Sequence, residues 1–443
     1  MSEWASGTLA DAIASLDAGV SVNAEDRPHG AGEIGVLKTS AISGGAFRTE
    51  QNKSVLQHER RLVAEPVQAD SILVSRMNTP ALVGESCYVR EAHPTLFLPD
   101  RLWQLKPRDR AQLNMRWLSF VLQSADYRRY VEVHATGTSG SMKNLPKSKL
   151  LALPVQYPEP AEQSVIAQIL DTLDTAIRET DALIDKLKAV KQGLLHDLLT
   201  RGIDANGQLR PPQSEAPQLY KESPLGWIPR EWDCTAVAAI ADVKSGATPS
   251  REMAHLYYAA TGINWVKTLD LNEDLIFETD ERITAQGLRG SSCVEFPAGT
   301  VLVAMYGGWE QIGRTGLLAV KAATNQAISS LLFRTEHVFP EFILRAMQHG
   351  RPRWQQVAAS TRKDPNITKA DVMEFPLPVP PKPEQEVIAG RYRSVLDQLQ
   401  IEQQQALKLK QQKSGLMDDL LTGRVRVTPL LESMQQAAAS TGA

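Results

Sequence analysis

The sequence predicts an α+β fold in which two mixed α/β globular domains are joined by two long antiparallel coiled-coil helices. The first observation is an internal repeat, because residues 154–200 align with residues 376–422 without a gap. The second is a hydrophobic spacing of alternating four and three residues in both copies, which is typical of a coiled-coil seam. The third is a mixture of strand-like and helix-like patterns before each copy. Together they predict an internal pseudo-two-fold repeat.

The order of the segments follows from this repeat. We expect a globular domain over 1–153, a helical segment over 154–203, a linker over 204–217, a second globular domain over 218–375, a second helical segment over 376–427 and a disordered tail over 428–443. The linker is rich in Pro, Gly and polar residues, which is typical of loops. Proline-rich runs precede both helical segments, so we expect the helices to start near Glu162 and Glu384.

Inside the globular domains, a few segments have a clear period. Residues 70–76 and 299–305 contain the β-branched runs of strands, and residues 114–131 have helical spacing. These patterns predict mixed strand and helix, but they leave the topology open.

Composition excludes several classes of protein. The chain has 443 residues, 42% hydrophobic and 22% charged, which excludes wholesale disorder. Its three cysteines have no metal-type spacing, so we expect neither a disulfide framework nor a zinc site. No apolar run approaches the ~18 residues of a membrane span, and the first residues lack a signal-peptide pattern. We therefore expect a cytoplasmic protein without a membrane partner.

Motifs that carry catalysis are missing. The sequence contains no GxxxxGK[ST] phosphate loop, no HExxH zinc helix and no GxSxG elbow. It also lacks an Asn/Asp-Pro-Pro-aromatic motif, which would hold a base amine for methylation. We therefore expect no catalytic residues, no metal ligands and no enzyme activity in this chain.

Local charge and loop chemistry favour nucleic-acid binding, although the net charge is −3. Residues 108–149 carry eight Lys or Arg against three acids, and residues 345–369 carry six against one. The two predicted strands are each followed by a loop with polar or flat side chains, and such arginines and amides can read guanine and adenine. We expect DNA contacts from Arg76, Asn78, Tyr306, Trp309, Gln311 and Arg314 in the loops, and from Lys143, Asn144, Lys147, Arg362, Lys363 and Lys369 in the basic stretches.

A simpler interpretation stays open for these loop residues. Arg76 and Arg314 could equally be surface charges, and Trp309 could be a core residue. The loops differ between the two copies whereas the helices do not, which favours two reading heads with different targets.

Several motifs together resemble one known family over essentially the whole chain. They are SRMNTPALVG (75–84), YKESPLGWIPREW (220–232), ATNQAI (323–328) and the two PxPxEQxxIA…KxGLxxDLLT-like repeats, the second of which ends in DLLTGRV (419–425). This pattern resembles the DNA specificity subunit of type I restriction–modification systems. The first repeat departs slightly, with HDLLTRG over 196–202, which leaves the exit from the first helix open.

The resemblance implies two target recognition domains that read a bipartite site in double-stranded DNA. It also implies that the helices dock two methyltransferase subunits, and that translocase–nuclease subunits join through them. S-adenosylmethionine, ATP and Mg are then expected on the partner subunits, with no cofactor bound by this chain. We expect the partner contacts at residues identical in both repeats: Glu162, Gln163, Lys188, Asp197, Thr200, Glu384, Gln385, Lys410, Asp419 and Thr422.

Other interpretations remain at this point. The Glu-Gln pairs could instead cap the helices. The whole chain could be a duplicated coiled-coil adaptor that joins protein partners without touching DNA. It could also be a phage-type decoy or orphan subunit that binds DNA without working partners. The DNA target itself cannot be derived from the sequence.

Overall fold

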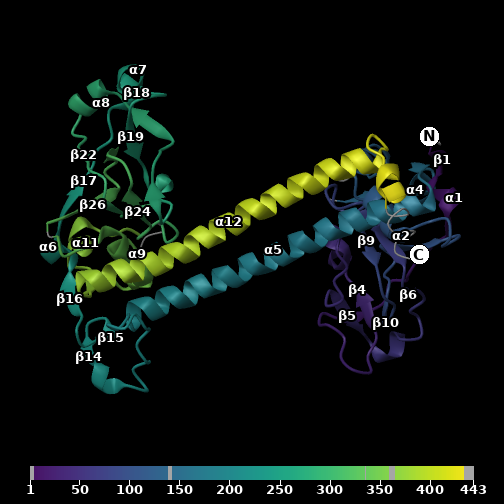
Figure 1. Cartoon of the computed structure of the whole chain (residues 1–443), viewed down its shortest axis with the longest axis horizontal. Helices are drawn as coiled ribbons and strands as arrows, with labels where there is room; N and C mark the ends of the chain where they lie inside the picture. The colour runs from purple at the N-terminus through teal and green to yellow at the C-terminus, as the bar shows by residue number, and fades with distance from the viewer. Residues whose placement is uncertain (1–3, 138–141, 335, 359–364, 434–443) are drawn as a thin grey trace. The chain divides into compact units, whose positions relative to one another are not determined.

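The computed structural model describes residues 4–137, 142–334, 336–358 and 365–433. The chain divides into two compact units: unit 1 comprises Met1–Asp181 and Gln404–Ala443, and unit 2 comprises Ala182–Gln403. Two long helices, α5 (Pro160–Thr200) and α12 (Lys382–Leu421), each continue from one unit into the other (Figure 1). Each unit therefore holds the start of one long helix and the end of the other.

The globular part of unit 1 contains two main sheets. A four-stranded antiparallel sheet has the order β2 (Ile13–Ala18), β11 (Leu102–Pro107), β7 (Ser71–Ser75) and β9 (Ser86–Val89). A five-stranded sheet has the order β3 (Ala24–Glu25), β5 (Asn52–Val55), β4 (Gly35–Leu37), β10 (His93–Phe97) and β6 (Pro66–Val67). Strands β4 and β10 of this second sheet are parallel.

Shorter elements complete unit 1. They are β1 (Ala5–Thr8), α1 (Leu9–Ala12), η1 (Thr39–Gly45), η2 (Gln57–Glu59), β8 (Met77–Asn78), α2 (Met115–Val121), α3 (Ala125–His134), β12 (Lys143–Asn144), α4 (Lys147–Leu151) and β13 (Pro154–Tyr157). Strand β1 pairs with β13, immediately before α5 begins.

Unit 2 repeats this plan. Its first sheet has the order β17 (Ala241–Ser245), β26 (Ile328–Phe333), β23 (Val301–Ala304), β24 (Thr315–Leu318) and β20 (Leu275–Ile276). Its second sheet has the order β18 (Tyr258–Ala259), β21 (Glu281–Ile283), β19 (Ile263–Val266), β25 (Ala322–Thr324) and β22 (Glu295–Phe296). Strands β19 and β25 are parallel, as β4 and β10 are in unit 1.

The remaining elements of unit 2 are short, apart from α9. They are η3 (Pro217–Leu219), β14 (Tyr220–Ser223), β15 (Gly226–Pro229), β16 (Asp233–Ala236), α6 (Val237–Ile240), η4 (Arg251–Met253), α7 (Ala254–Tyr257), η5 (Thr268–Asp270), α8 (Ala285–Arg289), α9 (Pro340–Gly350), η6 (Arg351–Arg353), α10 (Trp354–Val357), α11 (Lys369–Glu374) and β27 (Pro376–Val379). Strand β16 pairs with β27 immediately before α12, as β1 pairs with β13 before α5. The duplication therefore extends to the order of the shared strands in both sheets, to which unit 2 adds β20, parallel to β24, and the β14–β15 hairpin.

The two predicted strands are β7 and β23, and both are buried on both faces. In β7, Ile72 and Val74 pack with the helices of unit 1, whereas Leu73 packs between the two sheets. In β23, Val301 and Leu302 divide between two clusters in the same way. Burial on both faces explains why these strands have continuous apolar runs rather than an alternating pattern.

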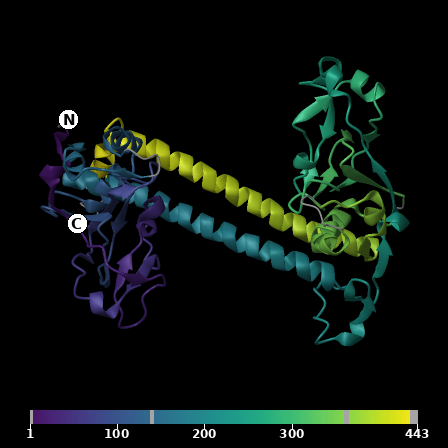
Figure 2. The same ribbon diagram turned by 180° about the vertical axis from the view of Figure 1, so that it is seen from behind.

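The long helices pack antiparallel in each unit, as predicted. In unit 1, Lys413 forms an ion pair with Asp174 at 2.5 Å and Lys410 forms one with Asp181 at 3.1 Å. From Lys410 to Lys413 the residue number rises along α12, whereas the number of the α5 partner falls from Asp181 to Asp174. The two helices therefore run antiparallel. In unit 2, the end of α5 and the start of α12 lie side by side (Figure 2), and they share a hydrophobic cluster. Buried seam positions such as Ile166 and Leu420 confirm the predicted period.

Three details differ from the predictions. Both long helices begin two residues earlier than expected, because proline is tolerated in the first helical turn. The helix predicted over 114–131 is divided into α2 and α3, because Ser124 caps the second helix by accepting a hydrogen bond from the Tyr127 amide. The predicted disorder does not hold for 428–433, which is helical with Leu431 packed on the core; residues 434–443 lie outside the described residues.

Candidate functional site: the ends of β7 and β23 and the two long helices

Four predicted DNA-binding residues of unit 1 lie close together at the end of β7. Strand β8 pairs antiparallel with β12, so that Lys143 lies opposite Asn78 and Asn144 lies opposite Met77. Arg76 precedes this ladder directly, and its carbonyl accepts a hydrogen bond of 2.8 Å from the Leu145 amide. The fold thus brings a loop residue and a basic-stretch residue into one ladder, although the sequence separates them widely.

Their side chains are partly engaged inside the unit. The Arg76 guanidinium is half-buried, lies 5.6 Å from the centre of the Trp103 ring and donates to the Asp100 carbonyl at 3.4 Å. The Asn78 amide group donates to Ser75 Oγ at 3.3 Å, and its oxygen accepts from the Thr79 amide at 2.8 Å. These two bonds use one of the two amide donors and one of the two oxygen lone pairs, so one donor and one lone pair remain for a contact with adenine.

The lysines of this region have different surroundings. Lys143 Nζ donates to the Gly137 carbonyl at 3.1 Å. Lys147 Nζ donates to the Leu16 carbonyl at 2.7 Å and so ties the start of α4 to β2. This contact gives Lys147 a structural role inside the unit, and the DNA contact expected of it stays a prediction.

In unit 2, the loop between β23 and β24 presents two aromatic rings to solvent. Tyr306 is 44% exposed and Trp309 is 48% exposed, so Trp309 is not a core residue. Gly307 and Gly308 between them have φ values of 111° and 76°, in the region that favours glycine. Their backbone turns the loop so that both rings remain outside the core.

Unlike the two exposed rings, the polar residues of this loop form hydrogen bonds within the unit. Arg314 donates to Gln311 Oε1 at 3.1 Å, so the two predicted base-reading side chains pair with each other. Arg351 donates to the carbonyls of Ile312 at 3.0 Å and Glu310 at 2.6 Å. Arg351 therefore holds the loop in place through two backbone carbonyls. From the sequence, Arg351 was counted only as part of a basic stretch.

The structure adds Asn366 to the candidate residues. The Ile367 amide donates to the Met305 carbonyl at 3.0 Å, as the Leu145 amide donates to Arg76 in unit 1. This bond brings the exposed Asn366 next to the start of the aromatic loop. The signal was present in the sequence, because NLPK (144–147) and NITK (366–369) occupy equivalent positions before the two helical repeats. Lys369 is exposed at the start of α11, and Arg362 and Lys363 lie outside the described residues.

Fewer side chains of the basic stretches are free to contact DNA than the charge of these stretches suggested. Several of their arginines are held by internal acceptors: Arg108 by the Ala10 and Ile13 carbonyls, Arg116 by Asp171 and Asp174, Arg128 by the Pro80 and Val83 carbonyls, and Arg345 by Asp274. The five donors of a guanidinium can satisfy several buried acceptors at once. The number of Lys and Arg residues in these two segments is therefore larger than the number of positive charges that are free at the surface.

The repeated glutamines attach each long helix to its globular part. Gln163 is 1% exposed; its amide group donates to the Gln112 and Pro158 carbonyls, and its oxygen accepts from the Asn114 amide. Gln385, fully buried, makes the same three contacts in unit 2, with the His337 and Pro380 carbonyls and the Phe339 amide. We call each of these sets of bonds a glutamine hook.

The repeated glutamates hold the end of the opposite long helix. Glu162 accepts two hydrogen bonds of 2.8 Å from Arg426 and one of 3.1 Å from the Trp4 indole. Burial disfavours the charge of Glu162, but these hydrogen bonds outweigh it and hold the pKa of Glu162 below its ordinary value. Glu384 pairs with Arg210 and accepts from the Ile203 amide at 2.8 Å. Arg210, which belongs to the predicted linker, is thus 7% exposed in unit 2.

The ends of the long helices use the other repeated residues. Asp197 pairs with Arg201, and Asp419 pairs with Arg424. The hydroxyls of Thr200 and Thr422 each donate to the carbonyl four residues earlier.

Each helix is followed by a glycine with positive φ, Gly202 at 65° and Gly423 at 72°. These glycines lie against Trp232 and Trp4 respectively. The two exits are therefore equivalent, although the sequence there reads TRG in the first copy and TGR in the second.

The partner contacts expected from the repeat need correction. Glu162, Gln163 and Gln385 are buried, and their identity in both copies is explained by contacts inside the chain. Lys188 and Lys410 remain exposed, but they differ: Lys188 pairs with Asp185 on its own helix, whereas Lys410 pairs with Asp181 on the other helix of unit 1. For the three buried residues the identity between the copies has an internal explanation, whereas partner contacts at the exposed residues stay a prediction.

Two kinds of feature are absent from the described parts of the chain. No group of three or more His, Cys, Asp or Glu side chains is placed to hold a metal ion there. No helix among those residues is both long and apolar enough to cross a membrane.

Comparison with known proteins gives one consistent result. The chain matches the type I restriction modification DNA specificity domain over residues 1–189 and 229–411. It is 23% identical over 283 residues to the type I restriction enzyme MjaVIII specificity subunit of Methanocaldococcus jannaschii; this match spans 62% of the chain and 63% of the relative.

Two solved structures share the fold. The type I restriction–modification S subunit from M. genitalium has a TM-score of 0.59 at 15% identity, with 94% of this chain and 96% of that chain covered. A chain from a study of complex assembly in the type I R-M system has a TM-score of 0.54 at 14% identity, with 95% and 98% covered. The chain therefore belongs to the family of type I restriction–modification DNA specificity subunits.

Proposed function

We propose that this chain is the non-catalytic DNA-recognition subunit of a type I restriction–modification complex, and that each unit reads one half of a bipartite site. The observation that carries the proposal is the duplicated topology, in which two different loops follow the equivalent strands β7 and β23. The frame is the same in both units, whereas the residues at the strand ends differ. Such a design suits two half-sites of different sequence.

The two loops favour different contacts with DNA. Unit 1 offers amide and ammonium groups at Asn78, Lys143 and Asn144, which suit hydrogen bonds to base edges. Unit 2 offers the exposed rings of Tyr306 and Trp309, beside Asn366. Aromatic rings contact thymine methyl groups and exposed base faces, so the two half-sites are read by different chemistry.

Half-site binding tests this division. We expect Lys143→Ala with Asn78→Ala to weaken binding only to DNA that carries the first half-site, by about 1–3 kcal/mol per base contact. We expect Trp309→Ala to act only through the second half-site. Trp227→Ala is the matched control, because Trp227 lies in the same unit and is 46% exposed. Equal losses on both half-sites would contradict the proposal.

We further propose that the long helices dock two methyltransferase subunits, through which translocase–nuclease subunits join. In this arrangement S-adenosylmethionine, ATP and Mg belong to the partners. Support comes from apolar side chains left exposed on the long helices in unit 2: Leu183, Val190, Val387 and Ile401. We propose that these side chains belong to one covered surface, since contiguous apolar patches with a polar rim mark protein–protein interfaces.

Co-purification with a co-expressed methyltransferase subunit tests the docking surface. We expect Val190→Asp and Lys188→Glu to reduce the recovered partner by at least about tenfold, which corresponds to roughly 1.4 kcal/mol. Leu269→Asp is the control, because Leu269 is 70% exposed in the globular part of the same unit. Unchanged recovery with both helix variants would contradict docking here. Docking without any half-site effect would instead favour the protein adaptor.

A further inference from the structure

In unit 1, an ion pair joins the globular part to α5. Arg116 of α2 contacts Asp171 at 2.5 Å and Asp174 at 2.9 Å. The guanidinium also lies 4.2 Å from the centre of the Phe120 ring, and the side chain is only 16% exposed. The globular part therefore presents a positive charge here, and the long helix presents negative charges.

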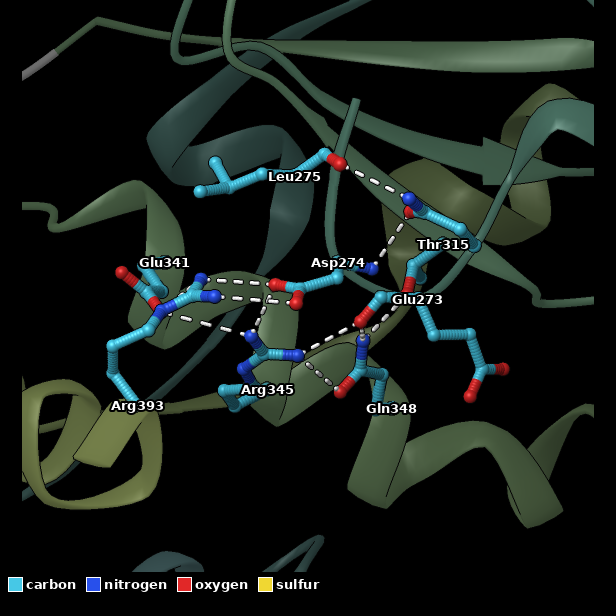
Figure 3. Close-up of polar contacts among 9 residues, drawn as sticks. Glu273, Asp274, Leu275, Thr315, Glu341, Arg345, Gln348 and Arg393 are labelled. Carbon is cyan, nitrogen blue, oxygen red and sulfur yellow. Dashed lines mark hydrogen bonds and ion pairs between the residues drawn. The ribbon is translucent and has the colours of Figure 1, made fainter. Parts of the chain in front are cut away.

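In unit 2, the corresponding contact joins α9 to α12. Glu341 of α9 binds Arg393 of α12, with N–O distances of 2.6 and 2.8 Å. Figure 3 shows that Arg393 and the buried Arg345 converge on Asp274, at 2.9 and 2.8 Å. Burial disfavours the charge of Asp274, but Arg393 and Arg345 outweigh it and hold its pKa below the ordinary value.

The two ion pairs occupy equivalent positions. The glutamine hooks fix the alignment, because Gln163 binds the Asn114 amide and Gln385 binds the Phe339 amide. Arg116 and Glu341 are each the second residue after those amides, and Asp171 and Arg393 are each the eighth residue after the glutamines. The position is the same in both units, but the polarity is reversed.

We propose that this reversed ion pair is a matching code that assigns each globular part to its own long helix. Exchange of the globular parts would place Arg116 against Arg393, or Glu341 against Asp171 and Asp174. Like charges in a partly buried contact strongly disfavour the wrong pairing, since specificity is the difference between two affinities.

In the native chain, connectivity already places each globular part before its own helix, because β13 runs into α5 and β27 into α12. The code therefore acts when a globular part is placed before the other helix. The glutamine hooks are the same in both units and would accept either globular part. A contact shared by both pairings adds stability but cannot discriminate between them, whereas a reversed charge pair can. The inference concerns assembly of the chain and does not depend on the DNA-binding proposal.

An exchange chimera tests the code. In this chimera, residues 218–381 replace residues 1–159 in front of α5, so that the second globular part occupies both positions. We expect a low yield of folded monomer. Adding Asp171→Arg and Asp174→Leu, which reproduce the identities of Arg393 and Leu396, should raise that yield by roughly tenfold or more.

The same two substitutions in the native chain are the control. There Asp171→Arg with Asp174→Leu should lower the urea midpoint of unfolding, because Arg116 and Lys413 both lose an acidic partner and Arg116 faces a like charge. Adding Arg116→Glu should recover most of the lost midpoint. If the code operates, the same two substitutions raise the yield of the chimera and lower the stability of the native chain. Equal yields of the two chimeras, whether high or low, would overturn the proposal, as would rescue of the chimera by substitutions that also stabilise the native chain.

Discussion

Single residues in the long helices join segments that are far apart in the sequence. Glu162 is a clear case, because one carboxylate accepts hydrogen bonds from Arg426 and from Trp4. Arg426 lies beyond the end of α12, so this residue joins the start of one long helix to the exit of the other. A buried hydrogen bond to a charged group is stronger than a neutral one.

We expect Glu162→Gln to reduce the free energy of unfolding by about 2 kcal/mol, because a buried charge-assisted contact is lost and Arg426 keeps its charge. Glu132→Gln is the control, since Glu132 is exposed and pairs with Arg128 at a helix surface. Urea unfolding of both variants measures the difference. Similar small losses in the two variants would contradict the assigned role.

The same carboxylate predicts a dependence on pH. The pKa of Glu162 in the folded chain lies below its ordinary value of 4.5, so the unfolded chain binds its proton at higher pH than the folded chain does. The stability from Glu162 is therefore complete above about pH 4.5 and is lost as the pH falls through the lower, folded value. Urea midpoints between pH 7 and pH 3 should fall less steeply for Glu162→Gln than for the native protein. Parallel curves would exclude a contribution from this group.

At the scale of elements, the exits of the long helices depend on glycine. Gly202 has a φ of 65°, and a Cβ atom there would lie 2.3 Å from the Trp232 ring and 2.4 Å from Glu384. Both the backbone conformation and the close packing exclude a side chain. The tryptophan near the start of each globular part thus closes against the end of a long helix.

We expect Gly202→Ala to reduce the free energy of unfolding by more than about 2 kcal/mol, because a left-handed conformation and a clash add together. Gly193→Ala is the matched control. Gly193 lies inside α5 with open space around its Cα, so alanine there should stabilise the helix by about 0.5–1 kcal/mol. Thermal or urea unfolding checks both signs. Destabilisation by both variants would contradict the argument from the helix exit.

At the scale of the whole molecule, the duplication separates what is shared from what differs. Apart from the additional strand β20 of unit 2, the two units share the sheet order, the parallel strand pair in the second sheet, the glutamine hooks and the helix exits. They differ at the ends of β7 and β23 and in the polarity of the ion pair to the long helix. Shared features maintain the frame, whereas the differing features are the ones proposed to select DNA and to direct assembly.

The purified chain alone should not transfer methyl groups. The reason is the absence from the sequence of the motifs that would hold a target base or activate a nucleophile. Labelled S-adenosylmethionine and DNA measure this, with the co-purified methyltransferase complex as the positive control. Transfer by the chain alone, above the background of a mock purification, would contradict the non-catalytic role.

Local and periodic signals determined the frame of this protein from the sequence. The seam of the long helices, the strands β7 and β23 and the repeat itself depend on residues close together in the chain or on a constant spacing. The weak similarity of the globular parts, by contrast, did not reveal that their sheet orders match. Sheet order depends on contacts between distant segments, and many sequences satisfy the same order.

Only the tertiary structure decided what the repeated residues do. The sequence shows that Gln163 and Gln385 are identical, but identity cannot distinguish an internal contact from a partner contact. The ladder between Asn78 and Lys143 and the reversed pairs Arg116–Asp171 and Glu341–Arg393 were also hidden. The physical reason is that burial and charge pairing depend on which side chains lie within a few ångströms in space, and separation along the chain carries no record of that distance.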